Sequence, residues 1–213
     1  HNTIGNGSNI SLAQIQDQIN QLNNYFSNQY GGINSVNTGI QFCLAPVGPD
    51  GNGVIRYSDT LSNHNISNYN QFLALNTTLS HDKYLHIFTC NDIITDPGVK
   101  GYSSVFGDKY QGVVIEYKRF GKYNALSSAI NVDSASRGKV LVHEIGHFLG
   151  LLHTFEGGCG QSTDDCDKQG DKCCDTPPVS SFNSNCTSGR NSCHENYGNG
   201  DLIDQTENYM DYA

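Results

Sequence analysis

Two histidines and one glutamate stand at a spacing that suits metal chemistry. The chain reads His143-Glu144-Ile145-Gly146-His147, and residues four apart on a helix project from the same face. Two imidazole nitrogens can therefore converge on one ion at about 2.0 to 2.1 Å, the distance that zinc accepts. Glu144 lies roughly 100° further around the helix, so we expect it beside the water that the metal holds. A carboxylate in that place suits a general base.

A third ligand follows at a matching distance along the chain. Gly150 can adopt positive φ and end the helix, which lets the chain turn so that His153 returns toward the first two imidazoles. In a chain of this composition the full string His-Glu-x-x-His-x-x-Gly-x-x-His arises by chance with a probability of roughly 10⁻⁵. The sequence therefore predicts a zinc site made by His143, His147 and His153.

The residues that must position this site show an α/β pattern. Ser11 and Gln14 form a capping box, and apolar residues at helical spacing predict a helix over 12–29. A second helix over 134–149 would carry the first two histidines. Runs rich in β-branched and aromatic residues predict four strands, over 39–45, 84–90, 102–106 and 112–117. The pattern is weakest over 102–106.

Charge and apolar content exclude two classes of partner. Residues 1–142 carry nine acidic and nine basic side chains, whereas residues 143–213 carry twelve acidic and three basic ones, so the net charge of -9 lies in the last third. This gives no basic surface for nucleic acid. No apolar run approaches the roughly 20 residues of a membrane span. We expect a monomer that neither binds nucleic acid nor spans a membrane.

The eight cysteines predict disulfides. Their number is even and their spacing does not form paired Cys-x-x-Cys knuckles, which favours a secreted or extracellular protein, with the periplasm as the alternative. Cys43 and Cys90 end two of the predicted strands and could be neighbours. Residues 154–213 are poor in apolar side chains and would need disulfides or ions to stay folded.

The extended zinc motif resembles the signature of the metzincin metalloproteases, which also carry a methionine turn beneath the metal. Met210 is the single methionine of the chain and lies in Asn208-Tyr209-Met210-Asp211-Tyr212, which matches that turn. The segments 153–159 and 170–178 match the pappalysin family within the metzincins.

The resemblance implies a two-lobed α/β fold. An upper lobe over 1–150 would hold a twisted, mostly parallel sheet and the two main helices, including the zinc-binding one. A loop-rich lower lobe over 151–213, held by disulfides and calcium, would hold the third zinc ligand, the acidic cysteine-rich loop and the Met-turn. Family members continue past the Met-turn with a loop and a helix, so we expect this chain to be truncated there. Family spacing also suggests a pairing of Cys166 with Cys193.

The resemblance also assigns further site residues. Tyr212 would hydrogen-bond the oxyanion, and Asp171 and Thr176 match positions that bind structural calcium, with the Cys174 carbonyl and Asp175 as further candidates. The segment 102–106 would be an antiparallel edge strand that pairs with an extended substrate; its candidate substrate residues are Tyr102, Ser103, Ser104 and Val105.

Together these patterns predict a secreted zinc endopeptidase that hydrolyses extended proteins or peptides through water activated by Glu144. Two alternatives stay open. One is an extracellular binding module, held by disulfides and calcium, whose zinc site is vestigial. A module that needed only the metal would have no use for Glu144, so the sequence speaks against this reading. The other is a zinc hydrolase that acts on a non-peptide ester or amide.

Overall fold

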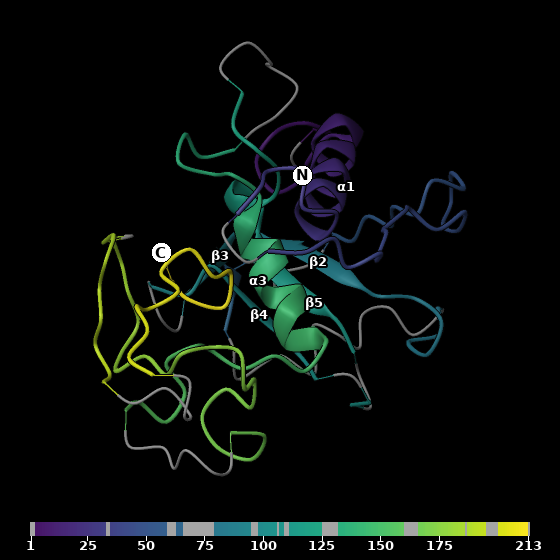
Figure 1. The fold of residues 1–213 in the computed structure, drawn as a ribbon. Helices are drawn as coiled ribbons and strands as arrows, with labels where there is room; N and C mark the ends of the chain where they lie inside the picture. The colour runs from purple at the N-terminus through teal and green to yellow at the C-terminus, as the bar shows by residue number, and fades with distance from the viewer. Residues whose placement is uncertain are drawn as a thin grey trace. The chain divides into compact units, whose positions relative to one another are not determined.

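The computed structural model describes residues 3–32, 35–58, 63–65, 79–94, 98–105, 107–108, 111–124, 132–159, 166–185, 187–194 and 200–212. These residues form two compact units, His1–Phe148 and Leu149–Ala213 (Figure 1). The first unit holds the helices and strands, in the order α1, β1, β2, β3, β4, β5, the short 3₁₀ helix η3 (Tyr117–Arg119) and α3.

The first helix, α1 (Leu12–Phe26), follows the predicted pattern. Ser11 caps it by accepting a hydrogen bond from the Gln14 backbone N–H at 3.1 Å. Ile15, Ile19 and Leu22 are buried along one face, as their spacing predicts. The predicted end at residue 29 is wrong by three residues. The Ser27 backbone N–H and hydroxyl both donate to the Asn23 carbonyl, which closes the last turn.

A three-stranded sheet in the order β2-β5-β4 forms the core of the first unit. The central strand β5 (Val113–Glu116) runs parallel to β2 (Ile87–Cys90) and antiparallel to β4 (Gly101–Ser103). Val113, Val114 and Ile115 have no exposed surface because neighbours cover both faces of a central strand. A separate parallel pair joins β1 (Asn63–His64) to β3 (Asp92–Ile93). The mixed α/β fold confirms the predicted fold class, with β4 as an antiparallel edge strand.

The predicted strand over 39–45 is wrong. These residues form no strand. At Phe42 a side chain of α1 takes both backbone groups that a ladder would use. The Asn23 amide nitrogen donates to the Phe42 carbonyl at 3.0 Å, and its oxygen accepts from the Phe42 N–H at 2.7 Å. The β-rich composition of this segment therefore does not lead to strand pairing.

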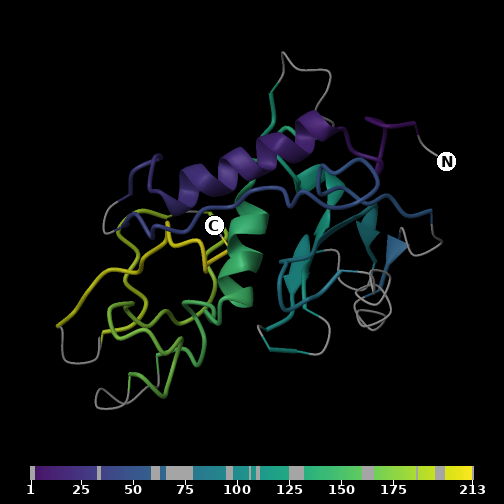
Figure 2. The same cartoon turned by 90° about the vertical axis from the view of Figure 1, so that its right-hand side faces the viewer.

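The second helix, α3 (Lys139–Phe148), begins five residues later than the pattern predicts. Gly138 has a φ of +74°, which no right-handed helix contains. Leu141 and Ile145 are fully buried, and the helix contacts β4, β5 and α1. Figure 1 shows α3 in front of the sheet, and Figure 2, turned by 90°, shows it alongside the strands.

The second unit contains no helix or strand among its described residues. Two disulfides, Cys159–Cys193 and Cys166–Cys174, link it covalently. The predicted pairing of Cys166 with Cys193 is therefore wrong, although disulfides themselves are confirmed.

Cys43 and Cys90, which the strand pattern suggests as neighbours, form no disulfide. Both are free thiols, Cys43 exposed and Cys90 buried. The strand that was expected to bring Cys43 beside Cys90 does not form, so the premise of the pairing is absent.

Two glutamines tie α1 to the rest of the first unit, although hydrophobic spacing alone would leave them on the surface. Gln14 and Gln18 are fully buried. The Gln14 amide donates to the carbonyls of Tyr117 and Phe120 at 3.0 and 2.8 Å. The Gln18 oxygen accepts from the Gly121 N–H at 2.6 Å. These bonds satisfy the irregular backbone that follows β5.

We expect Gln14→Met to lower the free energy of unfolding by about 2 kcal/mol, because a buried carbonyl would lose its donor. Urea unfolding followed by circular dichroism measures the change. Gln16→Met on the exposed face of the same helix is the matched control and should leave the midpoint in place. Equal midpoints for the two variants would contradict a structural role for the buried amide.

Candidate active site

The segment 143–153 brings three imidazoles together. One turn of α3 separates His143 from His147; their rings are perpendicular and their Nε2 atoms lie 3.1 Å apart. Gly150, with a φ of +97°, ends the helical direction. After this turn, His153 contributes a third nitrogen, so that the three ligand atoms all lie within 4.8 Å of one another.

This arrangement fits a tetrahedral metal ion. Ligands held at about 2.0 to 2.1 Å by a tetrahedral centre are roughly 3.3 Å apart, close to the separation of the His143 and His147 nitrogens. Three neutral imidazoles form a donor set that suits zinc. Among the residues that the structure describes, this is the one group of three or more His, Cys, Asp or Glu side chains that converges in this way.

Glu144 is buried next to the first histidine in the sequence. Only 6% of its surface is exposed, and burial raises the pKa of its carboxyl to about 8. An ionised carboxylate in this place therefore needs a nearby cation, which is the condition that a bound divalent metal would meet.

A glycine on the edge strand gives Glu144 its room. A Cβ on Gly101 would lie 3.0 Å from Glu144 Cγ, 3.1 Å from its Oε1 and 2.6 Å from Ile115 Cδ1. The backbone of β4 can approach α3 this closely only because residue 101 has no side chain. The sequence motifs do not point to Gly101. The available signal is a glycine directly before the predicted edge strand over 102–106.

The edge strand presents its backbone groups alternately. The Glu116 N–H donates to the Lys100 carbonyl at 3.0 Å, and the Ser104 N–H donates to the Gly112 carbonyl at 3.0 Å. In an antiparallel pair the intervening residues point their backbone groups the other way, so those of Gly101 and Ser103 face away from β5.

The four candidate substrate residues therefore differ. Tyr102 and Ser103 lie in β4, whereas Ser104 is buried and also exchanges side-chain hydrogen bonds with Gly112. Val105 follows the strand and is 58% exposed. The final residue of the predicted strand, Phe106, lies outside the described residues.

The methionine turn is fixed to the residue that follows the third histidine. The Thr154 N–H donates to the Met210 carbonyl at 3.3 Å, and Met210 itself is buried. The Met210 N–H donates to the side chain of Asn208 at 2.9 Å. The turn thus has internal bonds of its own and one bond beside His153.

Tyr212 lies against the third histidine. Its ring centroid is 4.9 Å from that of His153, with the planes at 80°, and 5.1 Å from that of Phe155. The side chain of Tyr212 is 55% exposed. Tyr212 is therefore beside the histidine and partly exposed to solvent.

The proposed calcium residues form a local turn in the second unit. Asp171 is buried and accepts a hydrogen bond from the Cys173 N–H at 2.9 Å. Burial raises the pKa of its carboxyl, and hydrogen bonds from Cys173 and Thr176 oppose that rise. Cys174 and Asp175 are exposed. The chain's own donors already satisfy Asp171, so calcium at this turn remains a prediction.

Comparison with known proteins identifies the family. Residues 67–213 match the model of the peptidase M43 family, described as pregnancy-associated plasma protein-A. The chain belongs to this family. The resemblance to pappalysins that the motifs carry is therefore confirmed.

Solved structures share the fold of this M43 chain. The mature mirolysin of Tannerella forsythia, in complex with a cleaved peptide, matches with a TM-score of 0.75 and 29% identity over 98% of this chain and 80% of mirolysin. Promirolysin from the same organism matches with a TM-score of 0.71 over 70% of its chain.

Curated relatives of the M43 chain are named extracellular metalloproteases. One from Pyricularia oryzae is 31% identical over 96% of this chain, and one from Verticillium alfalfae is 47% identical over 36% of it. The chain spans 61% of the first relative and 23% of the second. No helix in the described part of the chain is long and apolar enough to cross a membrane.

We expect Gly101→Ala to displace Glu144 and to cost about 1 to 3 kcal/mol of stability, because the new methyl group overlaps Ile115 and the glutamate. Thermal unfolding measures the cost, and a crystal structure shows the carboxylate position. Gly32→Ala, at an exposed position, is the control, because its Cβ would meet only side-chain atoms of Ser35, the hydroxyl at 2.8 Å and Cβ at 3.4 Å. Unchanged stability and an unmoved Glu144 would show that the close approach is unimportant.

Proposed function

We propose that this chain is the catalytic part of a secreted zinc endopeptidase. The observation that carries the proposal is the convergence of the His143, His147 and His153 nitrogens within 4.8 Å, with the buried Glu144 adjacent in the same helix. Membership of the M43 family and the names of the curated relatives support it. The two disulfides and the word extracellular in those names support secretion.

The three histidines would hold the metal, and Glu144 would move the proton. When bound there, zinc would supply Lewis-acid chemistry, polarising a carbonyl and lowering the pKa of water. Glu144 would take a proton from the water as its oxygen forms a bond to the scissile carbon. It would then give that proton to the amine as the carbon–nitrogen bond breaks. A carboxyl whose pKa burial has raised is suited to return the proton as well as to accept it.

The edge strand and the exposed tyrosine would position the substrate. An extended peptide could pair with the outward backbone groups of Gly101 and Ser103, as an added strand does. This would hold the peptide beside Glu144, which touches the same strand. The Tyr212 hydroxyl would donate a hydrogen bond to the oxygen that becomes negative in the transition state.

Glu144→Gln tests the reaction directly. The amide keeps the size of the carboxyl and cannot accept the proton, so we expect proteolysis of denatured casein to fall by at least about 10²- to 10⁴-fold. Metal content, measured by mass spectrometry, should stay at about one zinc per chain. Chelation should remove activity from the parent enzyme, and added zinc should restore it.

Glu207→Gln is the matched control, because this glutamate is exposed and distant in sequence from the motif. It should retain the parent's rate. Cleavage by Glu144→Gln within a few-fold of the parent would exclude Glu144 as the base. A zinc-loaded parent that cuts no protein would favour the binding module, and cleavage of esters alone would favour the non-peptide hydrolase.

Tyr212→Phe tests the oxyanion contact. A hydrogen bond that forms to a developing charge acts mainly in the transition state, so we expect kcat to fall about tenfold with little change in KM. Steady-state kinetics on one fluorogenic peptide measures both constants. Tyr123→Phe, a partly exposed tyrosine of the first unit, should behave as the parent. An effect on KM alone would argue against the proposed role.

A further inference from the structure

A cluster of aromatic rings adjoins the third histidine. Phe155 stacks on His153 with ring centroids 4.7 Å apart. Phe182 lies 6.1 Å from Phe155 and 5.6 Å from Tyr212. We call Phe155, Phe182 and Tyr212 the aromatic shelf. It belongs entirely to the second unit, and all three rings are in mutual contact.

Two of the three rings of the aromatic shelf are exposed, although side chains of this size are usually buried. Phe182 is 54% exposed and Tyr212 is 55% exposed. Single exposed apolar side chains are ordinary on protein surfaces, but adjacent ones that form a patch commonly mark a binding site. This patch is continuous with a proposed metal ligand, so its occupant has to be something that comes to the metal.

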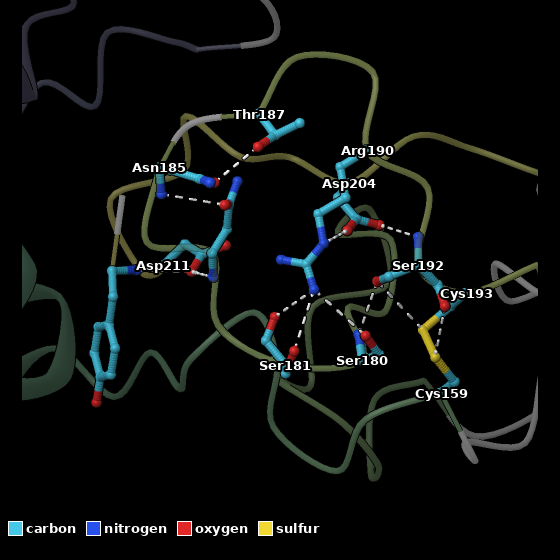
Figure 3. Close-up of polar contacts among 12 residues, drawn as sticks. Cys159, Ser180, Ser181, Asn185, Thr187, Arg190, Ser192, Cys193, Asp204 and Asp211 are labelled. Carbon is cyan, nitrogen blue, oxygen red and sulfur yellow. Dashed lines mark hydrogen bonds and ion pairs between the residues drawn. A yellow bond between two sulfur atoms is a disulfide. The ribbon is translucent and has the colours of Figure 1, made fainter.

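Hydrogen bonds hold the backbone on both sides of Phe182. On one side, the Arg190 guanidinium donates to the Ser181 carbonyl at 3.0 Å and pairs through Nε with Asp204 at 3.1 Å. Figure 3 shows Arg190 between Asp204 and Ser181. The side chain of Asp204 is 1% exposed, so this anchor is shielded from solvent.

On the other side, the Asn183 N–H donates to Asp211 Oδ1 at 2.8 Å. The same oxygen accepts from the Tyr212 N–H at 2.7 Å. One buried carboxylate therefore fixes the backbone next to both exposed rings of the shelf. Rings held in place before a ligand arrives lose little conformational freedom on binding.

We propose that the aromatic shelf binds an aromatic or large aliphatic side chain of the substrate close to the scissile bond. The inference rests on the proposed function and adds a substrate class to it. Phe182 touches Tyr212, which touches His153, so the shelf lies within roughly three residues of the reacting bond in a peptide that advances about 3.3 Å per residue. The tilted and edge-on rings leave apolar faces that a further ring can contact.

Cleavage-site profiling tests the shelf. The parent enzyme digests a peptide library made from a denatured proteome, and mass spectrometry identifies each cut. We expect Phe, Tyr and Leu to be enriched at one position within three residues of the cut. Two synthetic peptides with Phe or Ala at that position should then differ about tenfold in kcat/KM.

Phe182→Ala should reduce the ratio of kcat/KM for the Phe peptide to that for the Ala peptide to about 1 to 2, and Phe182→Tyr should preserve this ratio. Ile203→Ala removes an apolar side chain that is 61% exposed in the same unit and should leave the ratio unchanged. If Phe182→Ala does not fold, Phe182→Leu is used in its place. We expect this variant enzyme to prefer Phe over Leu at the enriched substrate position less strongly than the parent enzyme does.

The experiment distinguishes a failure of the proposed function from a failure of the aromatic shelf. A parent enzyme that makes no cuts overturns the proposed function. A parent that cuts without apolar enrichment overturns the shelf alone, and so does a Phe182 variant that keeps the parent's selectivity.

Discussion

The packing of one short helix against the edge of a sheet sets the position of every reactive group on α3. Leu141 and Ile145 are fully buried, and they place the histidines on another face of the same ten-residue helix. Glu144 points toward β4, where the absence of a side chain at Gly101 lets the two elements approach. The imidazole pair and the carboxylate therefore share one rigid support, which is the condition for a metal and a base to keep a fixed separation.

The second unit achieves order by different means. Its described residues include hardly any apolar core, and buried carboxylates take the place of one. Asp204 pairs with Arg190 and accepts a hydrogen bond from the Ser192 N–H. Asp211 accepts hydrogen bonds from the N–H groups of Asn183 and Tyr212. Charge-assisted hydrogen bonds of this kind offset part of the cost of burying a carboxylate. The acidic excess of the last third thus includes charges that organise the chain from inside.

Local patterns predicted much of the fold and the zinc ligands. The capping box of α1 and the helical spacing of the histidines are local, so the sequence contains all the information they need. The strand over 39–45 failed because a side chain of α1, Asn23, competes for its backbone. Gly138 delayed the start of α3 through a conformation that its residue type permits but does not require.

The features that the sequence does not reveal depend on contacts between segments that are far apart along the chain. Gly101 matters because α3 passes over it, and its place beside a predicted strand does not by itself reveal that contact. Phe182 stands in a polar, loop-like stretch, and its open position follows from bonds that Arg190 and Asp211 make to its neighbours. Cysteine pairing was mistaken for the same reason, since loop geometry decides which sulfurs meet.

Among the described residues both disulfides lie in the second unit, which also holds the free thiol Cys173. Two free cysteines of the first unit, Cys43 and Cys90, contribute no covalent link, whereas Cys159–Cys193 closes a long loop in the second unit. A reducing agent would leave the sheet and α3 with their packing intact and would restore chain entropy to the unit that carries His153. The chain would keep two imidazoles on a folded helix and lose a covalent restraint on the loop region that carries the third.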